Sequence, residues 1–262
     1  MELFPDASIG FKALILLAFL LAATEIGFRA GRRKRAGADE AARSEIGTIQ
    51  TAALGLLGLL MAFTLSMAVS RFERRIELVI NESNAIGTTE LRARMLPEPE
   101  RREFRDLLRR YVDVRIEYYE VSADEQLVQA AIRKTEELQG QLWSRASAMA
   151  EKDPRAVTTG LLLASLNEAI DLHAKRLVEM GNRVPQTVIW LLCVVAILTM
   201  GSVGYGCGLA NRRQFIFTLI LASLFALVGS VILDLDRPRE GLIKVGQKSM
   251  ISLRDSLNKA AP

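Results

Sequence analysis

Three stretches of the chain carry no charged side chain, and their lengths restrict what the chain can fold into. They are Ile46–Ser70 with 25 residues, Val184–Asn211 with 28 and Gln214–Leu233 with 20. A fourth stretch, Ile9–Thr24, contains Lys12 as its only charged residue. A helix of about 20 apolar residues spans the hydrocarbon core of a bilayer. The sequence therefore predicts an all-α polytopic membrane protein with four transmembrane helices.

The charged residues are concentrated in the segment between Ile46–Ser70 and Val184–Asn211, which are the second and third stretches in chain order. Residues 71–183 hold 19 basic and 20 acidic residues, although 50% of all 262 residues are apolar. This segregation excludes a soluble single domain and an intrinsically disordered chain. The balanced charge also excludes nucleic acid as a partner, because phosphate binding requires a surface that is basic throughout.

The pattern predicts four regions. They are transmembrane helices 1 and 2 with a basic connecting loop (1–70), an extramembrane four-helix region (71–183), transmembrane helices 3 and 4 (184–233) and an amphipathic tail (234–262). Stripes and caps within the second region predict helices over about 71–95, 99–120 and 123–150, and a fourth after Asp153. The stripe of the second helix consists of Phe104, Leu107, Leu108, Tyr111, Val114 and Tyr118, and the apolar face of the third consists of Leu127, Ala131, Leu138 and Leu142. No proline interrupts Gly47–Met95, which predicts one continuous helix of roughly 75 Å. The tail has two candidate placements, on the membrane surface or over a neighbouring subunit.

The distribution of basic residues predicts the orientation in the membrane. Loops 29–45 and 208–213 hold 8 bases in 23 residues, whereas the short segments on the opposite side hold 10 in 57. Basic residues in short loops favour the cytoplasmic side. We therefore expect both loops in the cytoplasm, and the N-terminus and residues 71–184 outside, in the inner (plasma) membrane of a bacterium. Glu2 and Asp6 precede the first span without any base, which predicts a retained span rather than a cleaved signal peptide.

The sequence carries no pattern typical of a catalytic, cofactor or metal site. His173 is the sole histidine and falls on an apolar stripe, so a hydrogen-bonded core histidine is favoured over a zinc ligand. Cys193 and Cys207 would lie about 21 Å apart on one helix and therefore cannot form a disulfide. Because no nucleophile–base spacing is recognisable, the sequence predicts a protein that is not an enzyme and that uses no cofactor.

One segment of the third span, Ser202-Val203-Gly204-Tyr205-Gly206, is similar to the selectivity filter of potassium channels. A filter requires a short pore helix before it, and residues 188–200 are too few to supply both that helix and a span. Glycines at 201, 204 and 208 also fit close packing between membrane helices, which is the favoured interpretation.

A cluster of charges closes the fourth span at the membrane boundary. Its members are Asp234, Asp236, Arg237 and Arg239. Ionisable groups at membrane depth are costly and are often functional. The alternative is a helix end whose opposite charges neutralise each other before Pro238 ends the helix.

A row of small and polar side chains follows one face of the long second helix. Its members are the candidate pore-lining residues Thr51, Gly55, Gly58, Ala62, Ser66, Ser70, Glu73, Glu77, Asn81, Asn84 and Thr88. Their spacing of about 3.7 residues per turn keeps the row nearly on one face with a slow right-handed drift. The row can be a close helix contact inside the membrane and a solvated face outside it. Alternatively, copies of the helix surround an axis and the row lines a pore for small ions.

Several motifs resemble those of a bacterial bestrophin-like family of four-span proteins with no established function. They are Ser70-Arg71-Phe72-Glu73-Arg74-Arg75, Asn81-Glu82-Ser83-Asn84-Ala85-Ile86-Gly87-Thr88, Leu96-Pro97-Glu98-Pro99, Asn182-Arg183-Val184-Pro185 and the segment from Leu233 to Ile243. The resemblance covers about 45–255 and implies two spans on each side of a helical domain. Bestrophins proper are pentameric anion channels with that domain in the cytosol, in conflict with the orientation expected above. No stretch matches their pore motif, so no pore residue is carried over.

Two functions from different classes follow from these observations. The first is a homo-oligomeric, ion-conducting pore of bestrophin-like type, with the lipid bilayer, further copies of the chain and small ions as partners. Small residues on spans two to four favour the close helix association that such an oligomer needs. The alternative is a non-conducting membrane scaffold or sensor with an outward-facing helical domain.

The orientation can be tested by single cysteines in a background that lacks Cys193 and Cys207. An impermeant thiol reagent applied to intact cells should label Glu137→Cys and leave Gly37→Cys unlabelled. The opposite labelling pattern would invert the topology.

Overall fold

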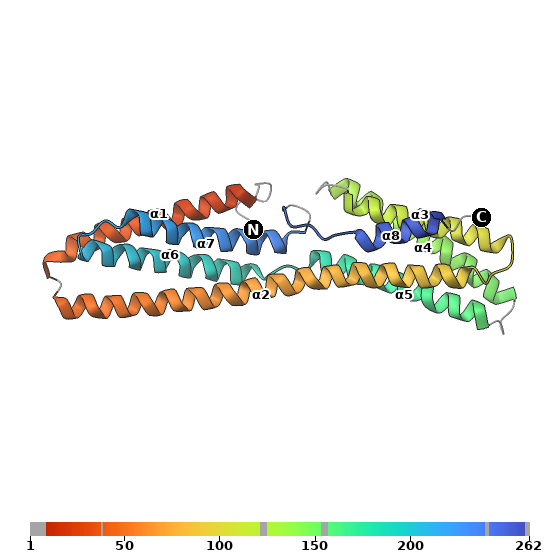
Figure 1. The fold of residues 1–262 in the computed structure, drawn as a ribbon, viewed down its shortest axis with the longest axis horizontal. Coiled ribbons are helices and arrows are strands. Elements are labelled where there is room, and N and C mark those ends of the chain that lie inside the picture. Colours follow the sequence, from red (N-terminus) through yellow and green to blue (C-terminus); the bar gives the residue numbers. More distant parts are fainter. Residues whose placement is uncertain (1–8, 38, 121–124, 153–156, 239–240, 260–262) are drawn as a thin grey trace. The chain divides into compact units, whose positions relative to one another are not determined.

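The computed structural model describes residues 9–37, 39–120, 125–152, 157–238 and 241–259. This part of the chain is helical and contains no strand, which confirms the predicted all-α fold. Its elements are α1 (Ile9–Lys34), η1 (Arg35–Gly37), α2 (Glu40–Ala93), α3 (Glu100–Glu120), α4 (Glu125–Lys152), α5 (Val157–Gly181), α6 (Gln186–Leu209), α7 (Phe215–Asp236) and α8 (Lys248–Lys259) (Figure 1). The predicted cap at Asp153 lies outside the described residues.

The chain divides into two compact units. Unit 1 comprises Met1–Arg71 and Arg183–Ile243, and unit 2 comprises Phe72–Asn182 and Lys244–Pro262. Helix α2 belongs to both, because its 54 residues, about 80 Å at 1.5 Å per residue, continue unbroken from one unit into the other. The region predicted as one tail is divided, since α7 extends to Asp236 and α8 belongs to unit 2.

In the part of the chain that the structure describes, four helical segments are long and apolar enough to cross a membrane. They are α1, the charge-free part of α2, α6 (the charge-free part of the stretch Val157–Leu209) and α7. The part of α2 that follows Arg71, together with α3, α4, α5 and α8, is rich in charges and lies outside the spans. These four segments agree with the predicted spans.

Helices α1 and α6 approach each other at glycines. Gly27 and Gly31 on α1 and Gly204 and Gly208 on α6 are buried. A Cβ atom added to any of them would overlap a backbone carbonyl oxygen of the facing helix. Such close contact supplies the dispersion attraction that replaces the hydrophobic effect between helices in lipid. Because the filter-like motif lies inside the continuous helix α6, the potassium-filter interpretation is wrong.

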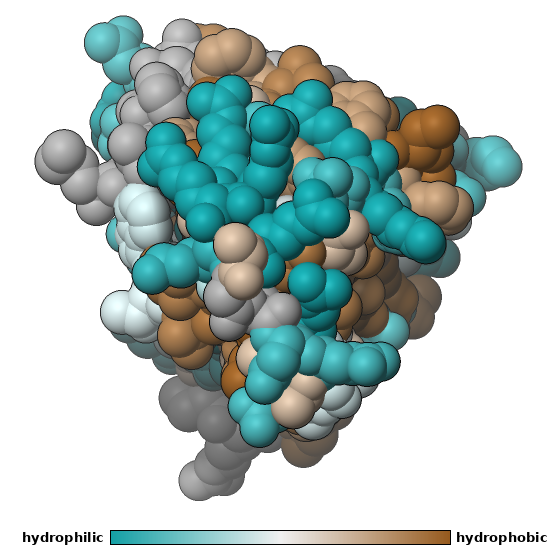
Figure 2. Space-filling view, turned by 90° about the vertical axis from the view of Figure 1, so that its left-hand side faces the viewer, coloured by the Kyte–Doolittle hydropathy of each residue, from teal (hydrophilic) through white to brown (hydrophobic). Residues whose placement is uncertain are grey.

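Both short loops of unit 1 lie at the same end of that unit (Figure 1). Arg213, which follows α6, donates to the two carboxylate oxygens of Glu25 on α1 at 2.8 and 2.7 Å, and Arg29 donates to the same carboxylate at 2.8 Å. Figure 2 shows hydrophilic residues gathered on this end and hydrophobic residues beside and behind them. The loops therefore lie together at one end of unit 1, and the side of the membrane that they face stays a prediction.

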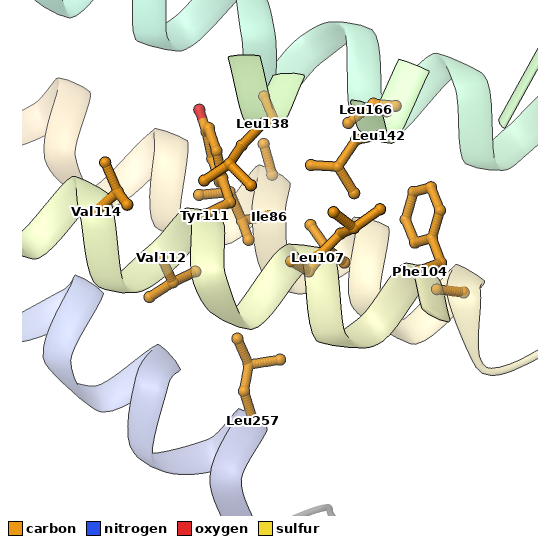
Figure 3. Close-up of a cluster of buried hydrophobic side chains, with 14 of the residues drawn as sticks. Ile86, Phe104, Leu107, Tyr111, Val112, Val114, Leu138, Leu142, Leu166 and Leu257 are labelled. Carbon is orange, nitrogen blue, oxygen red and sulfur yellow. The ribbon is translucent and has the colours of Figure 1, made fainter. Parts of the chain in front are cut away.

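Unit 2 encloses a hydrophobic core. The stripe predicted for α3 is buried in full: Phe104, Leu107, Leu108, Tyr111, Val114 and Tyr118. Figure 3 shows Leu138 and Leu142 of α4 in the same cluster as Tyr111 and Leu107 of α3. Leu127, predicted on the apolar face of α4, is exposed instead.

Helix α8 packs against α3 of its own chain. Met250 and Leu257 on its apolar face are buried, and Figure 3 shows Leu257 beside Val112. Arg109 on α3 donates to the carbonyl oxygen of Leu257 at 3.3 and 3.1 Å, at the helix end where carbonyls lack intrahelical partners. Neither placement predicted for the tail therefore describes α8, which lies within unit 2.

The glycine contact makes a prediction about stability. Gly204→Ala should destabilise the protein by about 1–3 kcal/mol, because the new methyl group meets the backbone at Thr24. Gly140→Ala is the matched control: it also lies inside a helix, and nothing approaches its added Cβ within 4 Å. The control should be neutral or stabilising by about 0.5–1 kcal/mol. Unfolding temperatures in detergent compare the two, and an equal or higher value for Gly204→Ala contradicts the contact.

Candidate functional site

The row of small and polar residues on α2 is uncovered along its length. Every member from Thr51 to Thr88 is exposed, apart from Asn81, which is half-buried. A Cβ atom added to Gly55 or Gly58 would meet nothing within 4 Å. The row is therefore not a contact surface inside the single chain, unlike the glycines of α1 and α6.

Inside the membrane, α2 has three faces of different chemistry. The first packs within the chain and includes Leu57, Met61, Thr64 and Ala68, which are buried. The second is exposed and carries large apolar side chains: Leu56, Leu59, Phe63 and Met67. The third is the row of small and polar residues. A bilayer can solvate the second face, whereas the third offers lipid neither bulk nor a continuous apolar surface.

The charges near the membrane boundary of α2 are distributed unevenly around the helix. Arg75 is buried and donates to the carbonyl oxygens of Glu179 at 3.3 Å and Asn182 at 2.9 Å, where it stabilises the C-terminal end of α5. Arg74 pairs with Glu77 at 2.7 Å on the surface. Glu73 is exposed and forms no ion pair within the described part of the chain. Of the two acidic residues in the row, Glu73 is thus the one without a paired base in the described part of the chain.

The predicted boundary cluster is brought together and buried. Asp234, Asp236 and Arg237 are each 6–7% exposed, while Arg239 lies outside the described residues. The Oδ1 atom of Asp236 accepts a hydrogen bond at 2.7 Å from the backbone N–H of Val184, just before α6 begins. This contact gives Asp236 a structural role at the entry to the third span. A functional role of the cluster stays a prediction.

A buried ion cluster in unit 2 was missed by the sequence analysis. Arg115 on α3 donates from Nε to Oε1 of Glu82 at 2.8 Å and from Nη2 to Oε2 at 3.3 Å, and Arg176 on α5 binds the same carboxylate. Glu82 and Arg115 are 0% exposed. Burial alone would raise the pKa of Glu82, but the two guanidinium groups outweigh it and lower the pKa to about 2.

Neutral polar groups complete this cluster. The Tyr111 hydroxyl donates to Glu82 at 3.4 Å and accepts from Gln139 at 3.1 Å. Burial and the adjacent carboxylate raise the pKa of Tyr111, so the phenol stays protonated. A local signal for the cluster was available, because Arg115 follows Tyr111 by four residues and therefore shares the apolar stripe of α3.

His173 lies beside the same cluster. It is 3% exposed, as predicted for a core histidine, but neither ring nitrogen has a hydrogen-bond partner among the described residues, so the predicted hydrogen bond is not found there. Burial and the positive charge of Arg115 lower the pKa of His173 to about 4. Within the described ranges, no group of three or more metal-ligating side chains is present.

Comparison with known proteins tests the predicted family. The model of the bestrophin-like domain matches residues 16–250, which is most of the chain. The chain belongs to the bestrophin-like family. No curated protein matches the sequence.

Solved structures of bestrophin homologues share the fold. One from Klebsiella pneumoniae, carrying a point mutation, has a TM-score of 0.70 and 14% identity over 97% of this chain and 98% of that chain. Another from the same organism, solved by zinc phasing, has a TM-score of 0.67 and 15% identity over 96% and 98%. Identity this low shows a common fold, and it transfers neither site residues nor activity to this bestrophin-like protein.

The buried cluster makes the folded protein sensitive to acid. In the unfolded chain, His173 takes up a proton near pH 6.5, whereas in the folded protein it does so only near pH 4. The unfolded chain therefore binds more protons than the folded protein between these two pH values. Stability therefore falls as the pH decreases through this window. Glu82 adds stability that is complete above pH 4.5 and is lost toward pH 2.

We expect the unfolding temperature to decrease between pH 6.5 and 4, and His173→Gln to reduce that decrease. The loss below pH 4.5, which belongs to the carboxylates, should persist in the variant. Identical profiles of the two proteins from pH 6.5 to 4 would show that His173 is not held neutral by its surroundings.

Proposed function

We propose that the protein is a homo-oligomeric ion pore in which copies of α2 surround an axis and the row from Thr51 to Thr88 lines the conducting path. The observation that carries the proposal is the three-faced helix. Its inner face is covered by the chain, and its large apolar face suits lipid or a neighbouring copy. The row of glycine, serine and threonine suits water and ions, since small and hydroxyl side chains leave room and provide oxygen atoms.

The charge of the row supports a preference for cations. In a symmetric oligomer, every Glu73 would lie at the same height and form one acidic ring. Arg74 pairs with Glu77, and Arg75 is buried at the end of α5, so neither of these two bases pairs with Glu73, while Arg71 is half-buried and lies outside the row. Rings of acidic side chains attract cations and repel anions at the mouth of a pore.

The pore is tested with purified protein in liposomes. Wild type should pass potassium ions, and Gly58→Leu should reduce the flux at least about tenfold, because each copy adds an isobutyl group to the axis. Ala52→Leu, an enlargement outside the row, is the control and should retain flux. Glu73→Gln should shift the reversal potential under a potassium chloride gradient toward lower cation preference.

Every protein in this comparison must have the mass of the assembled oligomer. A monomeric mass in mild detergent and in nanodiscs contradicts the proposal. If assembled wild type passes neither potassium nor chloride, the pore is refuted and the non-conducting scaffold takes its place. If Gly58→Leu conducts as well as wild type, the path lies elsewhere.

A further inference from the structure

The interior of unit 2 contains more positive than negative charge. Arg115 and Arg176 are 0% and 2% exposed, and within the described residues Glu82 is the carboxylate that pairs with them. The remaining side chains in contact, including the protonated Tyr111, are neutral. Arginine keeps its proton in proteins. One buried positive charge is thus left without a counter-charge, at a depth where an isolated charge is costly.

Donor groups without a partner are found on one side of this cluster. The nitrogen atoms of Arg176 are satisfied, since Nε donates to the Tyr119 hydroxyl at 3.0 Å, Nη1 to Glu82, and Nη2 to Oε1 of Gln247 at 3.3 Å. Nη1 of Arg115 and both ring nitrogens of His173 are buried, and no residue that the structure describes forms a hydrogen bond with them. His173 precedes Arg176 by one turn of α5, and Arg176 binds the same carboxylate as Arg115, so His173 lies on the side of α5 that faces this cluster.

We propose that this cluster binds one small inorganic anion of the halide class, such as chloride, held by Nη1 of Arg115 and an N–H group of His173. A monovalent anion supplies the missing charge and accepts hydrogen bonds from both donors, and a bond from guanidinium to an anion is charge-assisted. A water molecule would accept the hydrogen bonds but leave the charge unbalanced. A divalent oxyanion would instead leave an excess of negative charge. The site lies in unit 2 and does not depend on conduction along α2.

The experiment measures the unfolding temperature of the full-length protein in nanodiscs as sodium chloride replaces sodium gluconate at constant pH and ionic strength. Chloride should raise the unfolding temperature by about 3–6 °C for each tenfold increase above its dissociation constant, because it binds the folded state. His173→Gln, which keeps an N–H donor and adds no charge, should retain this dependence. Arg74→Gln, which removes a surface arginine, should also retain it.

Two variants remove the unbalanced positive charge that the anion would neutralise. His173→Glu supplies a carboxylate beside Arg115, and Arg115→Met removes the excess charge together with its unpaired donor. Each folded variant should have the same unfolding temperature in chloride and gluconate. The proposal is overturned if wild type responds equally to the two salts, or if either variant keeps the chloride response of wild type.

Discussion

A single helix that crosses two solvents is the constraint on which this structure depends. Helix α2 continues for 54 residues through unit 1 and unit 2, so one helical repeat must present suitable side chains first to lipid and then to a soluble core. Its buried face changes accordingly, from Leu57 and Met61 in the membrane to Glu82 and Glu90 in unit 2. Its exposed face carries members of the small and polar row in each unit.

The helices of the two units pack through different interactions. In unit 1, glycines let α1 and α6 come into backbone contact, because lipid provides no hydrophobic drive for helices to associate. In unit 2, water provides that drive, and leucines and aromatic residues fill the core. The ion cluster at Glu82 is one exception inside this core. Three elements, α2, α3 and α5, meet in that cluster, and such a fully buried pair fixes their register at a cost in desolvation.

The parts of the structure that follow from short-range patterns were predictable from the sequence. Charge-free stretches gave the four spans, and the spacing of Phe104, Leu107 and Tyr111 gave the buried face of α3. The cluster was not predictable in this way, because Glu82 lies 33 residues from Arg115 and 94 from Arg176. The position of Arg115 on the apolar stripe of α3 indicates its burial, but its partners are decided by which helices meet. The same holds for α6, whose glycines indicated close packing but did not identify α1 as the partner.

In the proposed oligomer, the small and polar face of α2 borders water, while its large apolar face does not. Single cysteines in a background lacking Cys193 and Cys207 test this most directly, through their rate of reaction with a charged, membrane-impermeant thiol reagent. Gly58→Cys and Ser66→Cys should react at least about tenfold faster than Leu59→Cys and Phe63→Cys in oligomers embedded in a bilayer. Equal rates on the two faces, or faster reaction at Leu59 and Phe63, would contradict the account.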